Sequence, residues 1–122
     1  MGDFEKSNIE FNSEIKLKAK AVMPWYNLGF ANILAGDRHK SLDLFLKANN
    51  IDQNVFEVAF QTGRLLLEMD QPESGKKFLE HAAELEPESG AVCRYLGECY
   101  TAIGDVEAAI SAYKKAIKHN PS

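Results

Sequence analysis

Residues 90–122 read GAVCRYLGECYTAIGDVEAAISAYKKAIKHNPS. Apolar side chains recur with a helical period from Ala91 to Ile103, and again from Val106 to Ile117. Gly104 and Asp105 lie between these segments. Glycine commonly ends a helix, and aspartate commonly caps the N-terminus of the next one. The stretch therefore predicts two helices connected by a tight turn.

The same pattern returns when the chain is shifted by 34 residues, which indicates stacked supersecondary units. Glycine, alanine, bulky apolar, small and proline positions keep their register: Gly29, Gly63 and Gly97; Ala48, Ala82 and Ala116; Phe45, Leu79 and Tyr113; Ser41, Gly75 and Ala109; Pro87 and Pro121. Turn residues recur at Gly36-Asp37 and at Asp70 to Glu73. We expect three copies, at residues 22–55, 56–89 and 90–122.

With these residues the chain resembles the tetratricopeptide repeat family, whose unit shows W-x2-L-G-x2-Y, then A-x3-F, then P. The matching segments are Trp25-x2-Leu28-Gly29, Leu96-Gly97-x2-Tyr100, Ala109-x3-Tyr113, Ser41-x3-Phe45 and the two prolines. Departures from the pattern fall at Asn32, Gln53, Ala59, Thr62 and Cys93. The resemblance implies an all-α fold, a right-handed α-solenoid of about three and a half helix-turn-helix repeats.

The half repeat is expected over residues 1–21. In the 34-residue register, residues 3–17 correspond to the second helix of a repeat, with Phe4, Phe11 and Ile15 as its apolar stripe. Glu14 stands where alanine is expected. Because apolar residues of this segment also alternate with a period of two, a strand or a disordered leader is the alternative.

The repeat pattern also predicts the core. The residues expected between helices are Leu28, Phe45, Ala48, Leu66, Leu79, Ala82, Leu96, Tyr100, Ala109, Tyr113 and Ala116. Cys93 and Cys99 lie six residues apart on one predicted helix, about 9 Å along its axis, which is too far for a disulfide. We interpret both as core residues.

Composition disfavours several functional classes. Lys and Arg total 14 against 18 Asp and Glu, a net charge of −4, which does not favour binding to nucleic acid. No secretory signal or membrane span is visible, so a cytoplasmic location is the default expectation. His39, His81 and His119 are far apart in the sequence, and no metal-ligand or phosphate-loop motif occurs. We expect no cofactor, no bound metal and no catalysis.

By resemblance, the first helix of each repeat lines a concave face that holds an extended peptide of a partner protein. The side chains expected there are Tyr26, Asn27 and Phe30, then Phe60, Gln61 and Arg64, then Arg94, Tyr95 and Glu98. Aromatic side chains suit burial of partner groups, and arginine offers a fork for a carboxylate. The alternative is that the aromatic stripe packs on neighbouring helices and that Arg64 pairs with Glu68 four residues on.

One subtype of the family grips the acidic C-terminal tails of heat-shock chaperones with Lys, Asn and Arg side chains. Those places hold Tyr26, Phe30, Gln61, Ala91 and Tyr95 in this chain. We therefore predict that chaperone tails do not bind.

The last predicted helix keeps Ile110, Tyr113 and Ile117, the kind of residues that earlier copies use to pack on the next repeat. Such a stripe predicts self-association through the repeat ends, or a missing continuation of the chain. Two alternatives to peptide binding follow: a self-assembly unit that stacks through its ends, and an adaptor fragment of a larger multidomain protein or enzyme.

Overall fold

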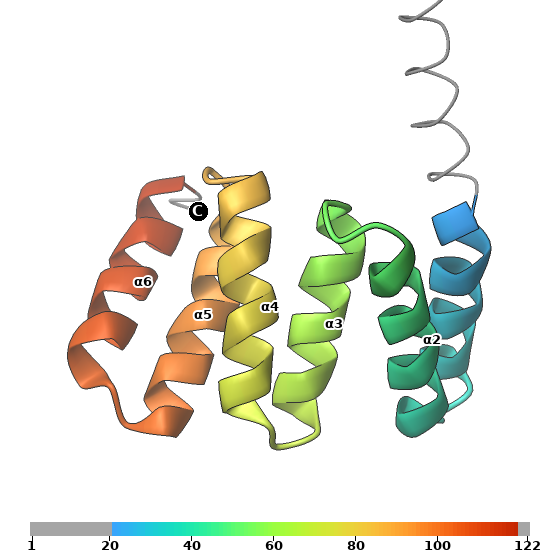
Figure 1. Cartoon of the computed structure of the whole chain (residues 1–122). Coiled ribbons are helices and arrows are strands. Elements are labelled where there is room, and N and C mark those ends of the chain that lie inside the picture. Colours follow the sequence, from blue (N-terminus) through green and yellow to red (C-terminus); the bar gives the residue numbers. More distant parts are fainter. Residues whose placement is uncertain (1–20, 120–122) are drawn as a thin grey trace, which may run out of the picture. The chain divides into compact units, whose positions relative to one another are not determined.

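The computed structural model describes residues 21–119, and the half repeat expected over residues 1–21 lies almost wholly outside them (Figure 1). A first helix covers residues 21–34 and is called helix 21–34 below. The further helices are α2 (Arg38–Ile51), α3 (Phe56–Glu68), α4 (Pro72–Leu85), α5 (Gly90–Ile103) and α6 (Val106–His119). The described residues form helices and turns without a strand, which confirms the all-α prediction. The chain divides between Gln53 and Asn54 into two compact units, called the first and the second unit below.

The turns inside the repeats adopt left-handed backbone conformations at corresponding positions. Gly36 has φ of 85° and Gly104 has φ of 98°, values that glycine adopts without steric cost. In the middle copy, Asp70 stands in that place with φ of 62°. Asp105 then caps α6, since its carboxylate accepts a hydrogen bond from the Ala108 amide at 3.2 Å. The predicted stop-and-restart signals are therefore turns of one shared geometry.

Small residues allow the two helices of each pair to approach closely. A Cβ atom placed on Gly63 of α3 would lie 2.6 Å from Leu79 Cγ and 3.0 Å from the Gly75 carbonyl oxygen, both on α4. In the next pair, a Cβ on Gly97 would meet the Tyr113 ring at 2.7 Å. The recurring glycines are thus packing positions, where the absence of a side chain sets how closely the helices cross.

The core of the second unit lies where α3, α4, α5 and α6 meet. Its buried cluster contains Ala59, Leu79, Ala82, Val92, Leu96, Cys99 and Ala112. Of the predicted core residues, Phe45, Ala48, Leu66, Leu79, Ala82, Leu96 and Ala109 are confirmed as buried, while Tyr100 and Ala116 are half-buried.

The prediction that Leu28 is a core residue is wrong, because 49% of its surface is exposed. The corresponding residue of the third copy, Leu96, is only 7% exposed because it packs in the cluster that α4 and α5 share. No described helix precedes helix 21–34 to cover Leu28 in the same way. Tyr113 is also more exposed than expected, although its ring covers Gly97.

Both cysteines are buried free thiols, as the sequence predicts for core residues. Burial, with a smaller contribution from the charge of Glu98, raises the pKa of Cys99 from 9.0 to about 11. The thiol therefore stays protonated at neutral pH, which disfavours nucleophilic chemistry at this position.

Candidate functional site

In the second unit, the first helices of two repeats place aromatic rings against one another. The Phe56 and Phe60 rings of α3 are stacked, with centroids 5.7 Å apart and planes 6° apart. Phe60 then meets Tyr95 of α5 edge to face, at a centroid distance of 5.6 Å. Such arrangements are favourable ring geometries. Three rings from two helices thus form one continuous apolar surface.

Two guanidinium groups lie over the Tyr95 ring. The Arg94 group is 4.7 Å from the ring centroid and the Arg64 group is 5.9 Å from it, both within the range of cation–π attraction. Arg64 also approaches Glu68, with Nε 3.8 Å from the carboxylate, a long contact between partly exposed side chains. We call Phe60, Arg64, Arg94 and Tyr95 the aromatic–arginine cluster.

Two further predicted site residues lie on the same helices as this cluster. Gln61 follows Phe60 on α3, and its side-chain oxygen is buried without a hydrogen-bond partner among the described residues. A buried acceptor normally has a partner in the protein, in water or in a ligand. Glu98 is exposed and lies one helical turn after Arg94 on α5.

The predicted site residues of the first unit lie on helix 21–34. The Tyr26 ring stacks on the buried Phe45 ring of α2 at a centroid distance of 5.7 Å. Phe30 lies 6.3 Å from Tyr26 and is partly exposed, and Asn27 is exposed. Tyr26 therefore contributes to packing, the alternative role for the aromatic stripe, whereas Phe30 and Asn27 remain accessible.

The outer surface of α6 carries the stripe expected to self-associate. Ile110 is 50% exposed, Ile117 is 65% exposed, and Tyr113 is partly exposed between them. Val106, one turn before Ile110, extends the stripe and was not predicted, although its helical spacing was a usable signal. We call Val106, Ile110, Tyr113 and Ile117 the α6 stripe.

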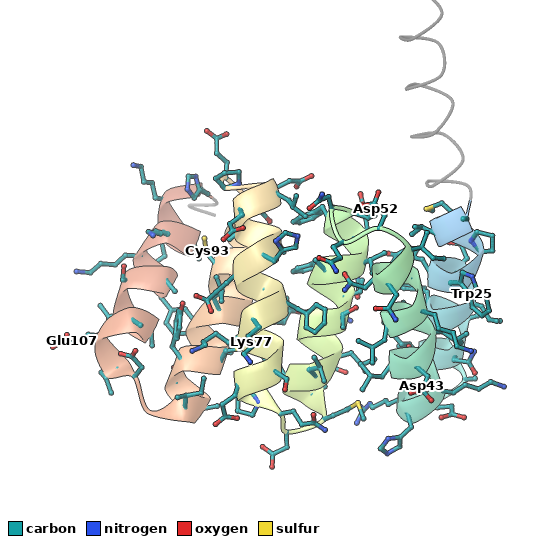
Figure 2. The ribbon with its side chains drawn as sticks, viewed as in Figure 1. Trp25, Asp43, Asp52, Lys77, Cys93 and Glu107 are labelled. Atoms are coloured by element: carbon teal, nitrogen blue, oxygen red, sulfur yellow. The ribbon has the colours of Figure 1, made fainter. Side chains whose placement is uncertain are left out.

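A shallow depression of about 400 Å³ runs along the polar edge of the α6 stripe. Its lining consists of Glu107, Ile110, Ser111, Lys114, Lys115 and Lys118. Figure 2 shows Glu107 extending away from the other helices. The exposed apolar stripe is therefore bordered by lysine side chains on one side.

Residues 21–119 contain neither a cluster of metal-ligating side chains nor a membrane-spanning helix. Within that range, no three His, Cys, Asp or Glu side chains gather as a metal site requires. On α4, the His81 Nδ1 atom lies 3.5 Å from a carboxylate oxygen of Glu84. Nor do these residues include a helix with the length and apolar character needed to cross a bilayer.

Comparison with protein families finds two matches, both to models described as tetratricopeptide repeat, over residues 56–89 and residues 91–122. Together these segments make up more than half of the chain. Comparison with curated protein sequences finds no match.

Solved structures with this fold include MamA, residues 41 to the end, from Desulfovibrio magneticus RS-1. It superposes with a TM-score of 0.79 at 26% identity, over 82% of this chain and 56% of that one. The first TPR of Spaghetti (RPAP3), bound to the HSP90 peptide SRMEEVD, superposes with a TM-score of 0.79 at 13% identity, over 83% of this chain and 80% of that one. The chain thus spans just over half the length of the MamA structure.

Proposed function

The chain belongs to the tetratricopeptide repeat family, and on this premise we propose that it is a non-catalytic scaffold that binds an extended peptide segment of a partner protein. The peptide lies on the face formed by α3 and α5, the first helices of the two repeats in the second unit. The observation that carries the proposal is the aromatic–arginine cluster, where side chains of α3 and α5 meet on one partly exposed surface.

The cluster favours a peptide that carries a carboxylate beside an apolar side chain. Phe60 and Tyr95 offer rigid aromatic area, which buries a partner group at low cost in side-chain entropy. Arg64 and Arg94 lie over one ring, and a guanidinium binds a carboxylate through two parallel hydrogen bonds. The contact of Arg64 with Glu68 is long and partly exposed, so a ligand carboxylate can replace it at small cost.

Gln61 supports an extended backbone as the ligand. Its side-chain oxygen has no hydrogen-bond partner among the described residues and lies on the helix that carries Phe60 and Arg64. Once rotation of the side chain exposes it, this oxygen accepts a hydrogen bond from a peptide N–H. Such a bond depends on the backbone of the ligand and not on its sequence, which suits a scaffold that selects side chains elsewhere.

The test is selection of binding peptides from a phage-displayed random library, followed by titration of one selected peptide against wild type, Phe60→Ala and Arg94→Ala. We expect each substitution to weaken binding about tenfold or more, a loss of about 1.4 kcal/mol, as for interface anchors. Lys77→Ala is the control, because Lys77 is exposed on α4, the second helix of its repeat, and not on the helices that carry the cluster. Circular dichroism checks folding, and equal affinity of wild type and both cluster variants would contradict the proposal.

Chaperone tails are not the proposed ligand. The Spaghetti structure binds SRMEEVD, but at 13% identity the likeness concerns the fold alone. In this chain the places of the carboxylate clamp hold Tyr26, Phe30, Gln61, Ala91 and Tyr95. We expect no saturable binding of SRMEEVD in the same titration, and a micromolar dissociation constant would contradict this expectation.

A further inference from the structure

The α6 helix presents a face that is covered in the preceding repeat. In the 34-residue register, α6 corresponds to α4, which packs against α5, the first helix of the next repeat. On α4 the residue Leu79 is completely buried. The corresponding Tyr113 and its neighbour Ile117 are exposed on α6. The α6 stripe is therefore an apolar surface of the kind that receives a first helix.

Helix 21–34 is a first helix with an exposed face of the matching kind. On α5, Leu96 and Cys99 belong to the buried cluster that includes Leu79 and Ala82 of α4. The corresponding residues of helix 21–34 are Leu28, which is 49% exposed, and Ala31, which is also exposed. The chain thus carries both halves of the α4–α5 contact in exposed form, one on each helix.

The polar groups bordering these two faces are compatible. Helix 21–34 carries no charged side chain, so its burial removes no charge from water. At the α4–α5 contact, Glu80 lies close enough to Tyr100 to raise the pKa of its hydroxyl, after the larger effect of burial. The corresponding residues are Lys114 on α6 and Asn32 on helix 21–34.

Asn32 is arranged to accept a hydrogen bond from such a lysine. Its side-chain amide nitrogen donates to the Leu28 carbonyl oxygen at 2.9 Å. The side-chain oxygen is then the group left to act as an acceptor, and a lysine ammonium is a donor only. A first helix placed on α6 in the manner of α5 would bring these two groups to the same border of the contact.

We propose that the α6 stripe of one copy docks on the Leu28 face of helix 21–34 of a second copy, reproducing the α4–α5 contact between molecules. This inference goes beyond the proposed peptide binding and uses none of the aromatic–arginine cluster. The contact joins two different surfaces, so each bound pair leaves one surface of each kind open to a further copy. One helix pair buries less than the roughly 1,600 Å² of a standard interface, so association is reversible and depends on concentration.

The test is the solution mass of the whole chain, measured by sedimentation equilibrium over a dilution series. We expect the average mass of wild type to rise above the 13.6 kDa monomer with concentration, and to continue past the dimer. Ile117→Glu removes one surface and Leu28→Glu removes the other, so each variant alone should remain monomeric. An equal mixture of the two should form dimers and nothing larger, because one intact contact remains between them.

Two control variants introduce glutamate on the same two helices, at positions outside the proposed contact. Leu34→Glu changes the same helix at an 80% exposed residue that corresponds to the exposed Ala102, and Ser111→Glu changes α6 away from the stripe. Both control variants should associate like wild type. Circular dichroism should show that all variants are folded. If Leu28→Glu does not fold, Leu28→Gln is the milder replacement. A wild type that is monomeric at every concentration overturns the proposal. Association of Leu28→Glu alone would also overturn the proposal, because it indicates pairing of α6 with α6. A mixture of the two variants that stays monomeric would overturn it as well.

Discussion

Replacing Gly63 by alanine tests whether the helix pairs are packed as described. In the interior of a helix, glycine to alanine normally stabilises a protein by about 0.5–1 kcal/mol. Here the new Cβ would lie 2.6 Å from Leu79 Cγ, 3.0 Å from the Gly75 carbonyl oxygen and 3.1 Å from the Leu79 amide nitrogen. Two of these are backbone atoms, so α3 and α4 must move apart. Overpacking costs about 1–3 kcal/mol, and we expect a net loss of about 1–2 kcal/mol.

The same substitution at Gly97 provides the comparison. There the three nearest atoms all belong to the Tyr113 ring, at 2.7 to 2.9 Å, and the partly exposed ring can swing outward. Gain and cost then nearly cancel, to within about 0.5 kcal/mol. Urea denaturation measures both changes, with Ser74→Ala on the exposed surface of α4 as a control for helix propensity. A neutral Gly63→Ala, or equal losses at Gly63 and Gly97, would refute the reasoning.

Three further predictions concern the core, a turn and a thiol. Ala82 is completely buried, so Ala82→Leu should lower the free energy of unfolding by about 1–3 kcal/mol, and an unchanged urea midpoint would show that the repeat register is wrong. An alanine at Gly104 would have open space around its Cβ but would keep φ of 98°. Gly104→Ala should therefore lower the free energy of unfolding by about 1–2 kcal/mol through backbone strain alone. An unchanged free energy of unfolding would contradict this, since it is the result expected if only steric clashes mattered. Burial raises the pKa of Cys99 in the folded state from 9.0 to about 11, so its contribution to the free energy of unfolding is complete below pH 9.0 and is lost as the pH rises towards 11. Cys99→Ala should therefore lose less stability than wild type between pH 9.0 and 11. Identical stability profiles of the two proteins over that interval would contradict the raised pKa.

The repeat register could be predicted from sequence because the same residue classes return at each structural position. Gly36 and Gly104 are the left-handed turn residues that their place between two helical patterns indicates. Asp70 shows why register predicts more than residue type does. It takes the same left-handed conformation without being glycine, and only its alignment with the two glycines identifies that place.

Burial in the first and last described helices could not be predicted in the same way, because the burial of a residue depends on which helix packs over it. Leu28 and Leu96 share a position in the repeat, yet Leu96 is in the buried cluster and Leu28 is exposed. The motif specifies the side chain and not its neighbour. This difference produced the wrong core prediction for Leu28, and it is also the basis of the proposed contact between copies.

The candidate site was predicted as a set of positions, and the structure adds how their side chains meet. Helical spacing alone does not indicate that Arg64 and Arg94, on different helices, both lie over the Tyr95 ring. Nor does it indicate that Tyr26 stacks on the buried Phe45. Both contacts depend on side-chain direction across a helix pair, which a single-helix pattern does not contain.

The most direct test of peptide binding at the aromatic–arginine cluster is a titration followed by NMR. Isotope-labelled chain would receive increasing amounts of a library-selected peptide, while the backbone amide signals are recorded. We predict that the largest shifts fall on α3 and α5, around Phe60, Arg64, Arg94 and Tyr95, with little change on α6. Shifts centred on the α6 stripe, with the α3 and α5 signals unmoved, would contradict the account.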